Sequence, residues 1–454
     1  MIGSNWTWTR GLAVAGTLAA SVLMGSNVMA AEETSEPQSA GLNFNPFDLP
    51  ENFGWLSDPE TPAENISDAL FGGKFSLNNR LRWEHVAETG LDETSVITNR
   101  TRFGYGTKAL NGLSFYAELE NNTPFDRSDG RSDASGAPAQ GTVTKAVVAD
   151  PEEVELNQAY IKYVFQGDIK LDVIAGRQRI ILDDARFVGN VGWRQMEQTF
   201  DAVRINTDLG VENFNLTYIY VWQMNRIFTE ESIAGLAPLD SQTHLINTSY
   251  KFNDALKLTG FAYLFDLSND AAGDANSNAT YGVTASGKVA VDENLNVVYS
   301  LTYATQSDYA DNTTKYSADF FAADGKLVAK DLGFGGVGYQ KLGSDNGTAA
   351  FQTPAGTNHA FQGWADVFLT TPPAGLQDLY VYAGTTFPCG TKVKISYHDF
   401  DAAKGGELGS EIDVVLSKKL NKNWSVLSKL ASYNGGSSAN ADRTKFILET
   451  TFTF

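Results

Sequence analysis

Basic side chains recur at alternate positions in several short stretches of this sequence. They are Arg80, Arg82, Arg100, Arg102, Lys162 and Arg204. Arginine stays protonated and presents a planar fork of N–H donors that pairs with carboxylates through two hydrogen bonds. A ladder of such groups predicts a path for anionic solutes.

Acidic side chains accompany these basic residues. We expect four of them to share the face that carries the arginines: Glu84, Glu118, Glu120 and Asp201. Charges inside a membrane protein usually pair. A second interpretation is therefore that the acids pair with the arginines, and that this network stiffens the part of the protein that carries them. The two interpretations are compatible, because a ring of opposed charges can brace a pore and set its selectivity.

Two further groups of residues lie in long segments between apparent strands. The first group is Asp183, Asp184, Arg186 and Arg194. It fits a gating loop that folds inward, and a solvated outer loop is the alternative. The second group, Trp364 and Phe368, lies in a segment that is apolar for a loop. A cluster of exposed aromatic side chains would promote association or aggregation. We therefore expect these two residues to lie in a constricting segment or lid.

Catalytic and metal-binding signals are weak. Ser396 and His398 would share one face of a strand, but no nucleophile-elbow motif accompanies them. The acidic residues around Gly405 and Gly406 match no calcium-loop spacing. The single cysteine, Cys389, forms neither an intrachain disulfide nor a thiolate metal site. We predict a protein that is not an enzyme and has no catalytic residues, no cofactor and no metal.

The elements that position these residues are strands. Period-two alternation, the mark of a strand with two different faces, runs from Gly72 to Phe454. In the final stretch, Phe446 and Leu448 share one face, whereas Lys445 and Glu449 share the other. Eighteen such stretches are present: 75–84, 97–108, 113–121, 157–165, 169–176, 202–208, 214–222, 245–252, 256–265, 281–289, 295–304, 316–322, 328–339, 379–385, 392–399, 411–417, 424–433 and 445–454.

Short and long connectors alternate between these stretches. The short ones are 110–112, 166–168, 253–254, 291–294, 324–325, 388–390 and 420–423, and the long ones include 122–153, 177–201, 223–244 and 341–378. This alternation is typical of up-and-down transmembrane barrels, whereas a soluble sandwich has no reason to produce it. We predict an all-β, antiparallel transmembrane β-barrel of about 18 strands. Its arginines would face the lumen, since a lipid-facing arginine costs about 2–4 kcal/mol.

Composition excludes other classes of protein. The 454 residues include 34 Lys and Arg against 54 Asp and Glu, a net charge of −20. This charge argues against nucleic-acid partners, which require clustered basic residues. After residue 30 no stretch approaches the roughly 20 apolar residues of a transmembrane helix. We expect the acids of segments 126–133 and 150–155 to lie in outer loops, where they are solvated or hold divalent cations.

The chain begins with a targeting segment. Arg10 precedes an apolar run that is too short to span a bilayer, and small residues at Val28 and Ala30 fit a secretory cleavage site. We therefore predict a signal peptide at 1–30. Residues 31–71 read as a periplasmic leader or short plug segment, with a disordered tail as the alternative. The barrel would span 72–454.

Several motifs resemble those of the alginate-export family of outer-membrane β-barrel porins. They occupy 79–84, 99–104, 176–180, 186–195, 198–204, 359–372, 375–380, 397–400, 409–413 and 442–446. The resemblance covers nearly everything from about residue 70 onward. It implies an eighteen-stranded outer-membrane pore, and the best-known member of that family secretes an anionic polysaccharide through an arginine-rich lumen.

The sequence and this resemblance predict an outer-membrane channel that conducts anionic solutes and exports an acidic, alginate-like polysaccharide. A general small-solute diffusion porin is the alternative, and an outer-membrane enzyme or adhesin is a third. We expect a Gram-negative-type outer membrane with both termini periplasmic. The expected partners are outer-membrane lipid and lipopolysaccharide, the barrel assembly machinery, and anionic polysaccharide or small anionic solutes.

Overall fold

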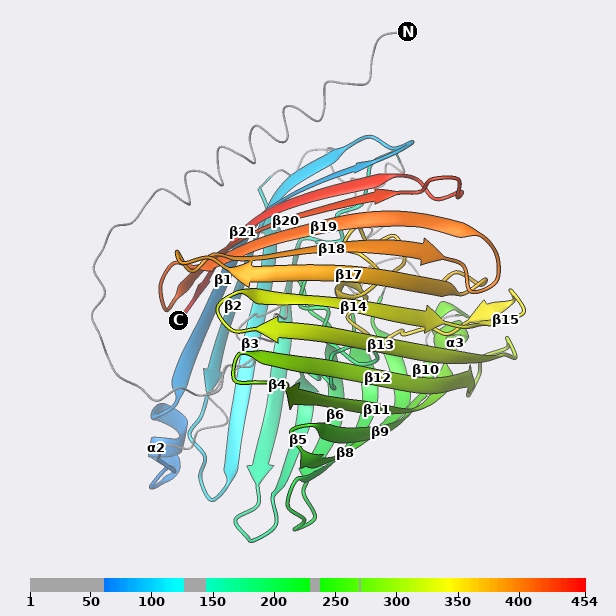
Figure 1. The fold of residues 1–454 in the computed structure, drawn as a ribbon. Coiled ribbons are helices and arrows are strands. Elements are labelled where there is room, and N and C mark those ends of the chain that lie inside the picture. The colour runs from blue at the N-terminus through cyan, green and yellow to red at the C-terminus, as the bar shows by residue number, and fades with distance from the viewer. Residues whose placement is uncertain (1–60, 126–143, 229–236, 269–270) are drawn as a thin grey trace.

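The computed structural model describes residues 61–125, 144–228, 237–268 and 271–454. The predicted signal peptide, the leader up to residue 60 and the acids of 126–133 lie outside the described residues. The described part consists mainly of long strands that wrap around a common axis (Figure 1).

Eighteen long strands form the wall. They are β1 (Lys74–Glu88), β2 (Thr94–Gly106), β3 (Leu113–Pro124), β4 (Glu153–Val164), β5 (Leu171–Gln178), β6 (Thr199–Thr207), β7 (Phe214–Asn225), β8 (Leu239–Asn253), β9 (Leu256–Phe265), β11 (Asn278–Ala290), β12 (Leu295–Asp308), β13 (Ser317–Ala329), β14 (Gly333–Leu342), β17 (Leu376–Thr386), β18 (Lys392–Asp401), β19 (Glu407–Lys419), β20 (Trp424–Asn434) and β21 (Arg443–Thr453).

The wall is a closed antiparallel barrel. Each long strand pairs with the next one along the chain. The last strand, β21, pairs with the first, with Arg82 opposite Glu449. Closure leaves no free sheet edge, which is what a strand-built protein requires in lipid. The predicted all-β barrel of about 18 strands is confirmed.

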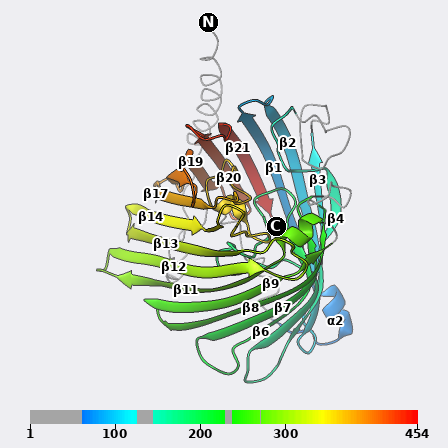
Figure 2. The ribbon, with the colours of Figure 1, turned by 90° about the vertical axis from the view of Figure 1, so that its right-hand side faces the viewer.

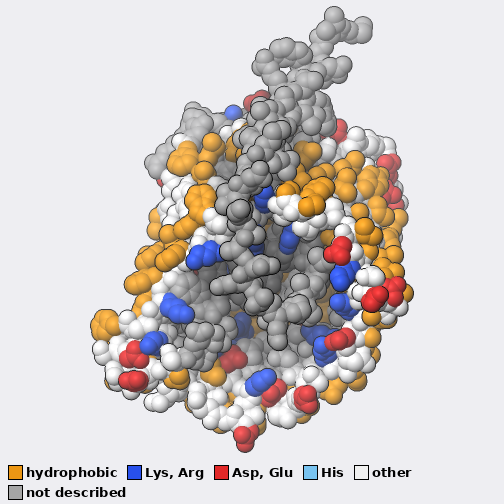
Figure 3. Space-filling model, turned by 60° about the vertical axis from the view of Figure 1, so that its left-hand side comes forward, with side chains coloured by type: hydrophobic (Ala, Val, Ile, Leu, Met, Phe, Trp, Pro, Cys, Tyr) orange, Lys and Arg blue, Asp and Glu red, His pale blue; other side chains and the backbone are white. Residues whose placement is uncertain are grey.

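Alternation along the strands separates two faces. On β2, Ile97 and Phe103 are exposed on the outer surface, whereas Arg100 and Arg102 are buried. Successive side chains of a strand point to opposite faces, so the apolar residues form the outer surface and the arginines face inward. Figure 3 brings the end with the short turns forward and shows hydrophobic side chains on the flanks and charged side chains nearer the centre of the view.

Loop length differs between the two ends of the barrel. One end, which we call the short-turn end, carries the connections 107–112, 165–170, 208–213, 254–255, 291–294, 330–332, 387–391 and 420–423. The other end, the long-loop end, carries the long connections, although 89–93 and 402–406 are short there as well. Strands β1 and β21 begin and end, respectively, at the short-turn end, where Phe454 bonds to Leu77.

One predicted turn is wrong. Asp324 and Gly325 lie in the middle of β13, and the chain turns at 330–332 instead. The pair resembles a turn in sequence, but Asp324 accepts hydrogen bonds from the hydroxyls of Tyr380 and Tyr382, which reach it from β17. This acceptor role explains an aspartate at an inward position of a strand.

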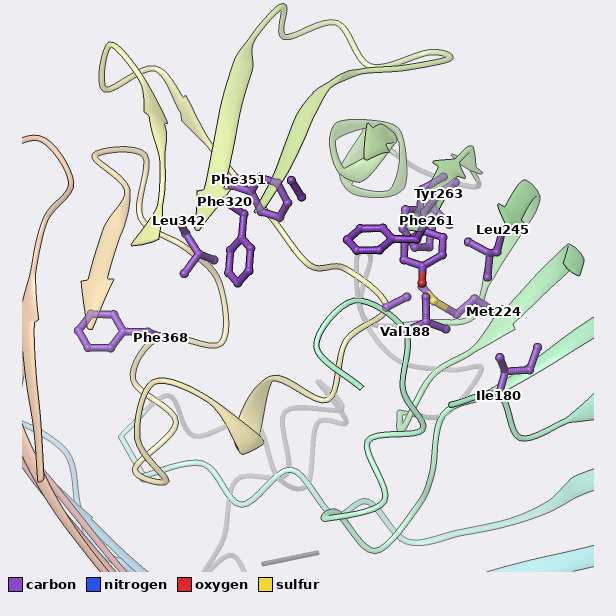
Figure 4. Close-up of a cluster of buried hydrophobic side chains, with 14 of the residues drawn as sticks. Ile180, Val188, Met224, Leu245, Phe261, Tyr263, Phe320, Leu342, Phe351 and Phe368 are labelled. Atoms are coloured by element: carbon purple, nitrogen blue, oxygen red, sulfur yellow. The ribbon is translucent and has the colours of Figure 1, made fainter. Parts of the chain in front are cut away.

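Two connections at the long-loop end fold back into the barrel (Figure 2). We call 179–198 the first inward segment and 343–375 the second inward segment. They meet through a parallel bridge between Val188 and Ala355. Apolar side chains of the wall pack against them, including Met224, Phe261 and Phe320 (Figure 4). Burial of these side chains helps to hold the two segments in the lumen.

Short elements decorate the barrel. They are α2 (Ile66–Phe71), β10 (Leu267–Ser268), α3 (Ala271–Asn276), β15 (Ser344–Asp345), β16 (Ala349–Ala350) and the 3-10 helix η1 (Asn358–Ala360). Helix α2 is capped by Asn65 and tied to the turn after β2 by an ion pair between Asp68 and Lys108. None of the described helices is long and apolar enough to cross a membrane.

Candidate functional site

The arginine ladder lies inside the barrel in a dense network of ion pairs. Six arginines and six carboxylates contribute: Arg80, Arg82, Arg100, Arg102, Arg179 and Arg194 with Glu84, Glu118, Glu120, Asp150, Glu197 and Glu449. The formal charges of this set cancel. The ladder is therefore neutralised within the protein rather than left open along the lumen.

Strand residues supply part of the network. Arg82 Nη2 lies 2.7 Å from Glu449 Oε2 on the neighbouring strand, and its Nε donates to the same oxygen at 3.0 Å. Arg102 pairs with Glu120 on β3. Arg80 and Arg82 also donate to main-chain carbonyls of the first inward segment, including that of Trp193 at 2.6 Å from Arg82. These bonds fasten the segment to the wall.

The first inward segment adds the remaining partners. Arg194 binds Glu84 and Asp150, with its Nη2 2.9 Å and 2.6 Å from their oxygens. Asp150 is fully buried, so the expectation that it is a solvated outer-loop acid is wrong. Burial alone would raise the pKa of Asp150, but the charges of Arg194 and Arg82 lower it. The carboxylate is therefore ionised inside the barrel.

The second inward segment is anchored through His359 and Asp366. His359 Nδ1 lies 2.5 Å from Asp366 Oδ1, and Lys445 Nζ lies 2.5 Å from Asp366 Oδ2. Lys429 Nζ lies 3.0 Å from His359 Nε2, which assigns the acceptor role to that nitrogen and the proton to Nδ1. Burial lowers the pKa of His359 well below its usual value, so the imidazole is neutral.

Aromatic rings complete this anchor. The Lys429 ammonium lies between the rings of Trp193 and Trp364, 3.5 Å and 4.1 Å from their centroids. Trp193 also stacks on His359 at 4.3 Å, so that the two inward segments are in direct contact. Phe368 packs on Phe400 at a ring distance of 4.9 Å. Trp364 and Phe368 are thus buried in the barrel rather than exposed to solvent.

An open cavity of about 620 Å³ lies on the other side of the inward segments. Its wall comes from β9, β11–β14, β17 and β18, away from the arginine-rich strands. Its basic residues are Arg186, Lys257, Lys326 and Lys394, and its acidic residues are Asp183, Asp184, Asp324 and Asp378. Phe187, Phe261, Phe320 and Trp364 supply apolar surface. The sequence indicated only part of this set, because the strand residues that line it are scattered over seven strands.

The remaining predicted path residues lie apart from the network. Lys162 and Arg204 occupy one rung of the sheet on either side of Ile174, nearer to the short-turn end. Asp201 lies on the opposite face of β6 from Arg204 and pairs with Arg177, Oδ1 to Nε, at 2.8 Å. Asp201 lies three positions before Arg204, and an odd separation along a strand places two side chains on opposite faces. Asp201 is therefore not among the interior acids.

The predicted gating residues separate into two places. Asp183, Asp184 and Arg186 line the cavity, whereas Arg194 lies in the ion-pair network. Asp183 accepts a hydrogen bond from Asn247 at 2.7 Å. Glu197 and Glu449, which complete the network, had no distinguishing signal in the sequence, since each looks like an ordinary acid until its partner is known.

Hydrolase-like and metal-like chemistry has little support in the described geometry. The Ser396 hydroxyl has no hydrogen-bond partner among the described residues, and His398 instead bonds to Asp378 at 3.0 Å. Within the described ranges, no cluster of three or more His, Cys, Asp or Glu residues is arranged to hold a metal ion. Ser396 and His398 both line the cavity.

Part of this barrel matches a known family. Residues 74–224, which include the whole arginine ladder, match the family model described as "Alginate export". Over these residues, which make up less than half of the chain, the barrel is similar to the alginate-export family. The match covers the strands of the ladder and the first inward segment, and it ends before the second inward segment.

Several solved structures share the fold of this barrel. OccAB4 of Acinetobacter baumannii superposes with a TM-score of 0.66 at 15% identity, covering 84% of this chain and 98% of that one. OpdL of Pseudomonas aeruginosa gives a TM-score of 0.60 at 15% identity over 84% and 99% of the two chains. Pseudomonas aeruginosa OccK9 (OpdG) gives 0.64 at 13% identity over 84% and 98%. No curated protein matches the sequence.

Proposed function

We propose that this chain is an outer-membrane channel for small solutes, with a lumen narrowed so that it selects among them. The observation that carries the proposal is the contact between the two inward segments, which bridge at Val188 and Ala355 and leave a cavity of about 620 Å³. That volume lies in the range of sites for single small organic molecules. A polymer chain would need the two segments to move.

Small anions are the solutes that this cavity favours. Three of its acids already accept hydrogen bonds: Asp183 from Asn247, Asp324 from two tyrosines, and Asp378 from His398. The ammonium-bearing side chain of Lys257 is exposed to the cavity. Basic groups that face acids across a narrow lumen also create a transverse field, which orients a polar solute.

Export of an acidic, alginate-like polysaccharide is the second candidate. The family match and the position of the arginine ladder favour it. Against it, the six arginines of the network already have carboxylate partners, and main-chain carbonyls of the first inward segment cover Arg80 and Arg82. Polysaccharide transport by this chain would therefore require the first inward segment to leave the lumen.

The membrane setting follows from the barrel. We infer that the short-turn end, with both barrel termini, faces the periplasm, because outer-membrane barrels carry short turns on that side. A signal peptide at 1–30 would provide export. Outer-membrane lipid, lipopolysaccharide and the assembly machinery that reads the final strand would be the partners of the outer face. A catalytic role has no place in this proposal.

Conductance in a planar bilayer tests the two candidates. The purified chain would be studied under a salt gradient, with uronate oligomers then added to one side. A small-solute channel should show steady conductance, modest anion preference and little block by the oligomers. Strong block by oligomers would favour the polysaccharide, and absence of conductance would overturn both.

A further inference from the structure

Helix α2 lies on the outer side of the wall at the short-turn end (Figure 1) and carries an exposed apolar surface. Three of its six residues, Ile66, Leu70 and Phe71, are large apolar side chains that are 68%, 51% and 84% exposed. The remainder of the helix faces the barrel, where Ala69 is buried and Asp68 forms an ion pair with the turn after β2. Contiguous exposed apolar side chains of this kind mark a contact surface.

The helix is fixed to the barrel by several polar contacts. The Lys108 main-chain N–H donates to the Ala69 carbonyl at 3.1 Å, and the Tyr105 hydroxyl donates to the Leu70 carbonyl at 2.6 Å. The ion pair between Asp68 and Lys108, at 2.8 Å, adds a side-chain contact. A helix of six residues is not stable alone in water. These contacts therefore determine which way its apolar side chains face.

The apolar surface of α2 continues into the outer surface of the barrel. Tyr105, which holds the helix, packs on Phe75 at a ring distance of 4.7 Å, and Phe75 packs on Phe103 at 5.6 Å. Phe75 and Phe103 are both exposed on outward positions of their strands. Outward apolar positions of a transmembrane barrel contact lipid. The helix and the first two strands therefore present one continuous surface to the same surroundings.

Aromatic residues indicate the level of the helix relative to a bilayer. Tyr105, Tyr163 and Trp424 lie on the outer surface, each at the end of its strand or one residue from it, at the short-turn end. Tyr and Trp gather where the hydrocarbon of a bilayer meets the headgroups. Because Tyr105 bonds directly to α2, the helix lies at this level. An amphipathic helix at this level buries its apolar side chains among acyl chains and keeps its polar groups wet.

We propose that α2 is a membrane-interface anchor whose residues Ile66, Leu70 and Phe71 insert into the phospholipid leaflet at the short-turn end. The inference goes beyond the proposed function and rests on it only for the membrane setting. Removal of three large apolar side chains from water drives the insertion. Because Tyr105 ties the helix to the wall, the anchor holds the start of β1, the strand on which β21 closes, at a fixed depth in the bilayer.

Fluorescence quenching of the full chain in phosphatidylcholine vesicles tests the anchor. The chain has one cysteine, and Cys389→Ser removes it while leaving a hydroxyl that can bond to Thr391 as the thiol does. A polarity-sensitive dye is then attached at Phe71→Cys or, as a second position on the same helix, at Ile66→Cys. Lipids that carry a nitroxide on the acyl chain near the headgroup should remove most of the emission at both positions. Iodide in the water should remove little of it.

Two further positions provide the controls. A dye at Phe103→Cys, on the outer surface of β2, should be quenched by the lipid nitroxides, whereas a dye at Glu293→Cys, in an exposed turn at the same end, should be quenched by iodide.

Quenching by iodide at either helix position would overturn the anchor. Shielding from both quenchers would overturn it as well, because another part of the chain would then cover the helix. If the lipid nitroxides quench the dye at Phe103→Cys but neither helix position, this inference alone fails. If they do not quench the dye at Phe103→Cys, the barrel does not contact lipid and the proposed function fails too.

Discussion

Arg194 and Glu84, which are 110 residues apart in the sequence, form a bidentate ion pair inside the barrel. Arg194 Nη1 lies 3.1 Å from Glu84 Oε1, and Nη2 lies 2.9 Å from Oε2. The pair connects the first inward segment to β1 at the start of the wall. Its partner Asp150 comes from the connection between β3 and β4, so one guanidinium joins three parts of the chain.

Arg194→Gln should release the first inward segment. Both Glu84 and Asp150 would lose a buried cation, and breaking a buried pair in this way costs about 3–5 kcal/mol. We expect a lower free energy of unfolding, larger single-channel conductance and more current noise. Lys404→Gln, at an exposed position of the long-loop end, is the control. Unaltered conductance and stability would mean that other contacts hold the segment.

Acid should loosen the second inward segment. Because burial lowers the pKa of His359, the released segment takes up a proton at higher pH than the anchored one does. Anchoring free energy is therefore present above about pH 6.5 and falls by up to about 1.4 kcal/mol per pH unit below it. The pKa of Asp366 is lowered by His359 and Lys445 despite burial, so its contribution is lost only near pH 4 and below.

Current recordings at pH 7.5 and pH 5 measure this effect. The parent channel should become noisier and more conductive at pH 5. His359→Gln should remove most of the difference, whereas His85→Gln, on β1 beside Glu93, should preserve it. A pH response that survives His359→Gln would assign it to another group.

Gly363→Ala should displace the turn that carries Trp364. Gly363 has φ +79°, and a Cβ there would lie 2.3 Å from Glu411 Oε2. Left-handed backbone alone costs an alanine about 1–2 kcal/mol, and the clash adds to it. Gly347→Ala is the matched control, because its φ is +81° and nothing lies within 4 Å of its Cβ. Thermal unfolding should show a larger loss of stability for Gly363→Ala than for Gly347→Ala. Equal losses would mean that backbone strain is the only effect and that the clash with Glu411 adds nothing.

Lys257→Glu should shift ion selectivity toward cations, because Lys257 is exposed to the cavity. Arg102→Gln should instead lower stability with little change in selectivity, since Glu120 and Glu197 would each lose one buried cation. Reversal potentials under a salt gradient measure both, with Lys330→Glu at an exposed turn as the control. The opposite ranking would place the ion path along the arginine ladder.

Local pattern was sufficient for most of the wall. Each of the eighteen long strands overlaps at least one stretch expected from alternation, because lipid outside and charged groups inside impose opposite side chains at successive positions. The turn predicted at Asp324 and Gly325 was wrong, because both residues lie within β13. The Asp324 carboxylate accepts hydrogen bonds from Tyr380 and Tyr382. These tyrosines become its neighbours only when β13, β14 and β17 pair.

The sequence by itself determined the strand number, the inward side of the ladder arginines and the existence of two unusual long segments. Only the tertiary structure decided where those segments lie and which acids meet the arginines. Glu449 is 367 residues from Arg82 and comes beside it only when β21 closes onto β1. The physical reason is the separation along the chain over which each effect acts. Alternation relates adjacent residues, whereas ion pairs and segment packing depend on closure of the whole barrel.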